Sequence, residues 1–139
     1  MPEFRVKDTS NDILIQTSTA VLEDHDGIVL DVAVSEEIDG AYYLASVGND
    51  YMLNVYDVTR RGSRIASLHQ AHEGVISCVT FGHGPVADRI YTGSWDRTIC
   101  VRDLKGREIK VLKKHKERIT DLCVSGDGRY VGVQMNCNV

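Results

Sequence analysis

One stretch decides the fold: TGSWDRTICVRD, residues 92–103. Two apolar segments flank a tight polar turn at Ser94-Trp95-Asp96, and the stretch closes on Asp103, seven residues after the turn aspartate. The same order occurs earlier in the chain, where Asp57 follows Asp50 by seven residues. A polar turn between two short apolar runs is typical of a β-hairpin, and its recurrence indicates a repeated β unit.

A histidine marks the start of each copy of this repeat. His25, His72 and His115 are 47 and 43 residues apart, and apolar residues follow each of them at positions +4, +7 and +9. Four strands are predicted in each complete copy. They cover 29–34, 42–46, 52–56 and 65–69 in the first copy, and 75–81, 89–93, 98–102 and 108–112 in the second.

The repeat resembles the WD40 family. The resemblance is carried by the period, the histidine, the Ser/Thr-x-x-x-Asp turn and the closing aspartate, and it covers roughly residues 4–133. It implies an all-β fold, a partial WD40-type β-propeller of antiparallel four-stranded blades, about two and a half blades long. The repeats are degenerate, because Tyr56-Asp57 and Arg102-Asp103 stand where the family has Trp-Asp.

In WD40 blades the repeated polar residues form a buried hydrogen-bond network. The resemblance implies such a network for His25, Ser46 and Asp50, and another for His72, Thr92 and Asp96. An imidazole can donate from one nitrogen and accept at the other, so it can link a carboxylate to a hydroxyl. Tyr56 can add its own hydroxyl to the first network. Arg102 cannot act in the same way, and we expect it to contact a carboxylate or solvent instead.

The sequence predicts no enzyme, no metal site and no cofactor. A Ser-His-Asp set repeated once per blade is structural, because a nucleophile needs an exposed hydroxyl beside a free base. His69, His72 and His83 near Cys78 fit no common zinc spacing. The four cysteines, at 78, 100, 123 and 137, lack Cys-x-x-Cys spacing, and we expect buried free thiols.

The repeat is incomplete at both ends. We expect residues 1–22 to be the end of an upstream blade (strands at 4–8 and 13–17), 25–68 and 72–112 to be blades, 115–133 to start a further blade, and 134–139 to be a non-repeat tail. Propellers close with about four to eight blades. The chain is therefore expected to be a fragment of a longer propeller or a truncated product, with ring closure by several copies as the alternative.

Charge is distributed unevenly along the chain. The net charge is −4, yet residues 105–118 hold seven basic and two acidic residues. Lysines on an edge strand commonly block edge pairing, and the alternative is an acidic peptide partner. Nucleic acid and phosphoinositide are not favoured as partners. No apolar run approaches the roughly 18 residues of a membrane span, so a cytoplasmic or nuclear location is expected.

Two surfaces are candidates for partner binding. Trp95 lies in a rim turn, where an exposed tryptophan is a typical interface hot spot, although packing against a neighbouring blade explains it equally well. Its neighbour Arg97 and the basic residues Lys113, Lys114 and Lys116 complete the candidate set. The predicted function is a scaffold that binds other proteins. The alternative is the regulatory or substrate-recruiting region of a larger enzyme, such as a ubiquitin ligase or an NTPase.

Overall fold

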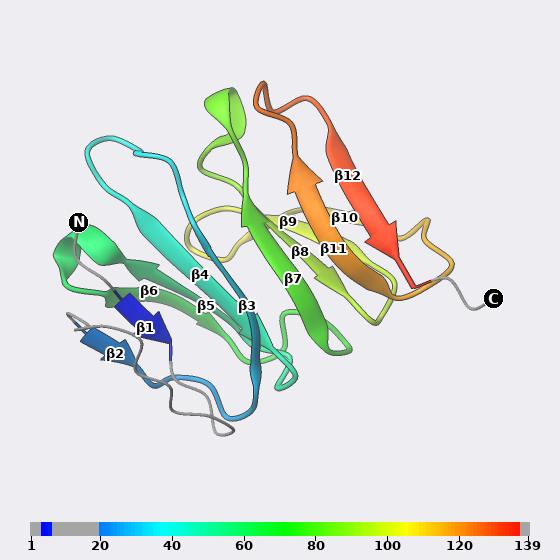
Figure 1. Ribbon diagram of the computed structural model, residues 1–139, viewed down its shortest axis with the longest axis horizontal. Coiled ribbons are helices and arrows are strands. Elements are labelled where there is room, and N and C mark those ends of the chain that lie inside the picture. Colours follow the sequence, from blue (N-terminus) through cyan, green and yellow to red (C-terminus); the bar gives the residue numbers. More distant parts are fainter. Residues whose placement is uncertain (1–3, 7–19, 137–139) are drawn as a thin grey trace.

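The computed structural model describes residues 4–6 and 20–136, and it consists of β-strands with two short 3-10 turns (Figure 1). The first four-stranded sheet contains β3 (Val29–Val34), β4 (Tyr43–Gly48), β5 (Leu53–Asp57) and β6 (Ser63–Leu68). The second contains β7 (Ile76–Phe81), β8 (Ile90–Ser94), β9 (Ile99–Arg102) and β10 (Glu108–Leu112). The 3-10 turns are η1 (Val58–Arg60) and η2 (Gly84–Val86).

Each sheet is an antiparallel meander in which consecutive strands pair. We call them the first blade (β3–β6) and the second blade (β7–β10). The prediction of an all-β partial propeller with antiparallel four-stranded blades is confirmed. All eight strands lie within two residues of the predicted bounds, because alternating apolar residues and turn residues fix where a short strand begins and ends.

The innermost strands bring the sheets together. In Figure 1, β7 lies between β3 and β11, and the sheets are arranged side by side. β11 (Ile119–Val124) pairs with β12 (Val131–Met135) as a two-stranded antiparallel sheet. β12 therefore includes Gln134 and Met135, which the sequence analysis assigned to the tail. Residues 137–139 of that tail lie outside the described residues.

The N-terminal strands differ from the expected blade end. β1 (Phe4–Val6) pairs in parallel with β2 (Ala20–Leu22), a strand that the sequence did not predict. The strand predicted at 13–17 lies outside the described residues. Leu22 of β2 is buried with Leu44, Tyr56 and Val58 of the first blade and the turn that follows β5.

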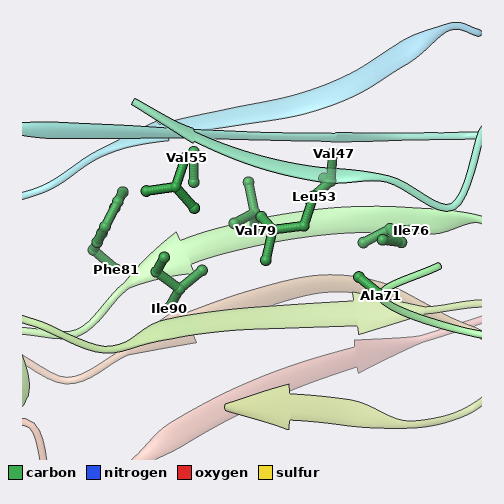
Figure 2. Close-up of a cluster of buried hydrophobic side chains, with 9 residues drawn as sticks. Val47, Leu53, Val55, Ala71, Ile76, Val79, Phe81 and Ile90 are labelled. Atoms are coloured by element: carbon green, nitrogen blue, oxygen red, sulfur yellow. The ribbon is translucent and has the colours of Figure 1, made fainter. Parts of the chain in front are cut away.

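A hydrophobic core fills the space between the two blades. Val47, Leu53 and Val55 of the first blade meet Ile76, Val79, Phe81 and Ile90 of the second, as Figure 2 shows. A second buried cluster joins the second blade to the β11–β12 sheet through residues such as Ile99 and Ile119. Burial of apolar area contributes about 25 cal/mol per Å². The interfaces between successive sheets therefore provide much of the stabilisation in this chain.

The cysteine prediction holds for two of three described residues. Cys78 and Cys100 are buried free thiols, whereas Cys123 is free but exposed, which corrects the expectation of burial. Cys137 lies outside the described residues. Cys123 is on β11, which adjoins the second blade on one side only, and the described residues place no further sheet against its other side. A residue pattern alone does not reveal that a strand face lacks a covering sheet.

Candidate functional site

The first blade contains a buried chain of hydrogen bonds around His25. The imidazole Nδ1 lies 2.8 Å from Asp50 Oδ2, and Nε2 lies 2.8 Å from Ser46 Oγ. A carboxylate can only accept, so Nδ1 carries the proton and Nε2 accepts from the serine hydroxyl. Asp50 also accepts from the backbone amides of Asp26 and Met52. The network therefore fixes both the loop before β3 and the turn between β4 and β5.

The second blade repeats this arrangement around His72. Nδ1 lies 3.0 Å from Asp96 Oδ2, and Nε2 lies 2.8 Å from Thr92 Oγ1. Thr98, which sequence reasoning missed, donates from its hydroxyl to Asp96 Oδ1 at 2.6 Å. Burial alone would raise the pKa of Asp96, but the hydrogen bonds from His72 and Thr98 outweigh burial and hold the pKa well below its usual range.

Tyr56 is fully buried, and its hydroxyl donates to Asp24 Oδ2 at 2.9 Å. Asp24 also pairs with Arg64 at 3.0 Å. Burial, followed by the hydrogen bond to the Asp24 carboxylate, raises the pKa of Tyr56, so the phenol stays protonated as a donor. Sequence reasoning expected this hydroxyl to join the network of His25, and it did not identify Asp24, which precedes that histidine, as the acceptor.

Arg102 occupies the corresponding position at the end of the third strand of the second blade. Sequence reasoning expected Arg102 to contact a carboxylate or solvent, and did not foresee that its two terminal nitrogens bind backbone carbonyls. Nη2 donates to Ala71 O at 2.8 Å and Nη1 donates to Gly106 O at 3.1 Å. No carboxylate among the described residues lies within ion-pair distance of Arg102. The guanidinium therefore holds two backbone segments in place rather than balancing a charge.

Trp95 is on the rim formed by the loops that these networks fix, and 41% of its surface is exposed. Its amide donates to Val75 O at 2.9 Å, which sets the turn between β8 and β9. The guanidinium carbon of Arg118 lies 4.6 Å from the centre of the Trp95 ring, a cation–π distance. Arg118 is in the connection that enters β11. Trp95 thus contacts the neighbouring sheet and still exposes much of its ring.

The candidate basic residues are exposed and unpaired. Arg97 follows Trp95 and Asp96 in the same turn with φ 72°, whereas Lys113, Lys114 and Lys116 lie in the connection from β10 to β11. None of the four has a carboxylate at ion-pair distance within residues 4–6 and 20–136. Arg118 shares this property, and sequence reasoning missed it because a contact between sheets leaves no periodic signal.

The serine and threonine hydroxyls of the two networks are enclosed within the blades. Ser46 and Thr92 are fully buried and hydrogen-bonded, so neither hydroxyl is accessible as a nucleophile. Over the described part of the chain, no three His, Cys, Asp or Glu side chains gather as a metal site. Within the same residues, no helix has the length and apolar character needed to cross a membrane.

Comparisons with known proteins agree with this geometry. A family model described as WD domain, G-beta repeat, matches residues 62–103 and 106–136, more than half of the chain. The small ribosomal subunit protein RACK1y of Oryza sativa subsp. japonica is 37% identical over 60 residues, which cover 42% of this chain and 18% of that protein.

Two further relatives are similar at comparable identity. The WD repeat-containing protein 26 homolog of Arabidopsis thaliana is 32% identical over 65 residues, covering 46% of this chain and 11% of that protein. The nuclear distribution protein nudF of Aspergillus terreus is 31% identical over 117 residues, which cover 70% of this chain and 26% of that protein. The chain spans about a quarter or less of the length of these relatives.

Proposed function

The chain belongs to the WD40-repeat family, and we propose that it is a non-enzymatic scaffold whose rim binds acidic segments of other proteins. The observation that carries this proposal is the partly exposed Trp95 with Arg118 stacked on its ring. An aromatic side chain held rigidly at a surface provides contact area at little entropic cost. The backbone amide of Trp95 and the network of Asp96 fix the turn that carries the ring, and Arg118 packs on the ring.

The cations of the Trp95 turn and of the connection from β10 to β11 support an acidic partner. Arg97, Lys113, Lys114, Lys116 and Arg118 are exposed and have no carboxylate partner among the described residues. We call these five residues and Trp95 the basic rim. Unpaired cations attract an acidic segment from a distance and accelerate its association. The whole chain carries a net charge of −4, so the attraction is local to this surface.

The basic rim would also be the contact surface if the chain has the alternative function, as part of a larger enzyme. If the repeats are the regulatory or substrate-recruiting region of a larger enzyme, the basic rim holds the protein that the enzyme modifies or the protein that controls it. The two alternatives differ in the domain attached to the repeats. They agree on the residues that contact the partner, so one experiment on the basic rim tests both.

A selection from displayed random peptides tests this proposal without knowledge of the natural partner. We expect the 139-residue chain to enrich peptides rich in Asp and Glu, and we expect Trp95→Ala and Lys114→Glu each to abolish the enrichment. Added salt should weaken binding, because exposed charges are screened beyond about 10 Å at 0.1 M.

Two exposed residues away from the basic rim provide matched controls. Tyr130→Ala removes an aromatic side chain that is 69% exposed, and Arg129→Glu reverses an exposed charge. Both controls should enrich the same peptides as the unmodified chain. Enrichment of neutral peptides, or equal enrichment by Trp95→Ala and Tyr130→Ala, would show that the basic rim is not the binding surface.

A further inference from the structure

The first blade exposes a row of apolar side chains on β3. Val32 and Val34 stand seven and nine residues after the landmark histidine, and they are 47% and 53% exposed. The residues at the same places in the second blade, Val79 and Phe81, are only 5% and 2% exposed, because they pack in the core shared with the first blade. Among the described residues, no sheet covers the row on β3 in the way that the first blade covers β7.

The β11–β12 sheet has an uncovered face at the opposite end of the row of sheets (Figure 1). Leu122 and Val124 pack against the second blade. Alternate residues of a strand point to opposite faces, so the exposed Cys123 and its cross-strand partner Gly132 lie on the outer face. These two residues help to line a groove of about 330 Å³. The groove therefore lies on the side of this sheet that faces away from the second blade.

The boundary between the first and second blades shows what such a face receives. Ala33 and Ala45 pair across β3 and β4 at the places where β11 and β12 have their cysteine and glycine. Both alanines lie in the core that contains Val79 and Phe81 of the second blade. Small residues of one sheet thus receive the larger apolar side chains of the next. The groove on the β11–β12 sheet has the same composition, and the row on β3 supplies side chains of the matching kind.

We propose that copies of this chain associate head to tail, with β3 of one copy packed on the outer face of β11 and β12 of another. A second copy fits because it brings apolar residues at the spacing that the chain already buries twice between its own sheets. The two faces differ, so the contact is heterologous and repeats until a ring closes or an open array forms. The inference is independent of the proposed function, because no residue of the basic rim is on β3, β11 or β12.

Asp121 gives this contact a specific signature. Its counterpart Asp31 accepts from the amide of Val32 at 2.9 Å and, across the blade boundary, from the amide of Val79 at 3.0 Å. Asp121 accepts at Oδ1 from the amide of Leu122 at 2.8 Å, and its Oδ2 has no partner among the described residues. In the head-to-tail contact, Oδ2 meets the Val32 amide of the second copy, which already donates to Asp31. Two carboxylates then share one donor, so the negative charge of Asp121 opposes association.

Sedimentation velocity of the 139-residue chain at several concentrations tests the proposal. We expect oligomers whose share rises with concentration. Val32→Asp and Val34→Asp should each weaken association about a hundredfold, because each places an unpaired carboxylate in an apolar contact. The matched control is Ile109→Asp, because Ile109 is as exposed as Val32 and lies on the outer edge strand of the second blade. A chain that is monomeric at every concentration, or equal losses in all three variants, would overturn the proposal.

Asp121→Asn provides a readout of the opposite sign. An asparagine amide can donate to Asp31 of the second copy, so we expect association to tighten about tenfold. Asp88→Asn removes the same charge from an exposed position in the turn before β8, and it should change association much less. Non-specific apolar aggregation would respond equally to both variants, and this result would contradict the assigned contact.

Cross-linking identifies the two faces directly. Cys123 is a free, exposed thiol, and Val34→Cys introduces a second thiol on the other side of the proposed contact. In a Cys137→Ser background, we expect a short thiol cross-linker to join Val34→Cys copies and to leave Ile109→Cys copies separate. Adding Cys123→Ser should abolish the cross-links. Cross-links that persist without this thiol would show that β3 meets a different surface.

Discussion

The first and second blades share their hydrogen-bond network and differ in what fills the outer half of the blade. His25 and His72 make the same two contacts, with Asp50 and Ser46 in one blade and with Asp96 and Thr92 in the other. At the end of the third strand, however, the first blade has a fully buried Tyr56 and the second has a half-buried Arg102 beside a groove. The network therefore forms with either a tyrosine or an arginine at this position.

The β11–β12 sheet shows the opposite case, in which the landmark histidine is present without its partners. Val133 pairs with Leu122, as Ser46 pairs with Val32 and Thr92 with Val79, so an apolar residue replaces the hydroxyl. His115 Nδ1 is buried and has no hydrogen-bond partner among the described residues. A histidine that retains its place in the repeat thus does not form the network alone.

The largest difference in stability between the two blades is expected when the side chain of Tyr56 or of Arg102 is truncated to alanine. Tyr56→Ala should lower the free energy of unfolding by about 4 kcal/mol, because it empties a fully buried site, whereas Arg102→Ala should cost about 1 kcal/mol beside an existing groove. Urea unfolding followed by circular dichroism measures both values. Equal losses would mean that the two blades are packed alike.

The network of the second blade is expected to depend on pH. The pKa of Asp96 is lower in the folded chain than in the unfolded chain, so its stabilisation is present above the unfolded value, about 4, and is lost as pH falls through the folded value. Asp96→Asn should cost about 2 kcal/mol at neutral pH.

Urea unfolding at several pH values measures this cost. The difference between Asp96→Asn and the unmodified chain should shrink in acid. The control Asp127→Asn removes an exposed carboxylate from the turn before β12 and should cost much less at neutral pH. A penalty for Asp96→Asn that does not change with pH would contradict the assigned role of the ionised carboxylate.

An aromatic residue should make the second blade more like the first. Arg102→Tyr is expected to raise the free energy of unfolding by about 1 kcal/mol, because the ring buries apolar area in the groove. Thermal unfolding measures the change, and Arg102→Gln, which removes the charge without adding a ring, is the comparison. If Arg102→Tyr is less stable than Arg102→Gln, the groove does not accept a ring.

The smallest change in the free energy of unfolding is expected when only the hydroxyl of Tyr56 is removed. Tyr56→Phe should cost about 0.5 kcal/mol, since Asp24 keeps its ion pair with Arg64 when the hydrogen bond from Tyr56 is lost. Tyr56→Phe in an Arg64→Ala background should cost more, because Asp24 then lacks both donors. Additive losses in this double-mutant cycle would show that the two donors act independently.

Most of the fold could be predicted from local signals. The alternating apolar residues and polar turns gave all eight strands of the two blades, and the repeated spacing of His25 and His72 placed them in register. β2 was not predicted, because three residues carry too little periodicity to be distinguished from a loop. Its parallel pairing with β1 depends on residues distant in the chain, which no local pattern encodes.

The candidate site divides in the same way. The sequence by itself determined which histidine, hydroxyl and carboxylate recur in the two blades, because these residue types stand at the same spacing in both copies. Only the tertiary structure decided that Arg118 stacks on Trp95, that Asp24 accepts from Tyr56, and that Arg102 donates to the carbonyls of Ala71 and Gly106. These contacts join segments that meet only after the sheets pack together, and their geometry depends on volumes and distances that spacing along the chain does not specify.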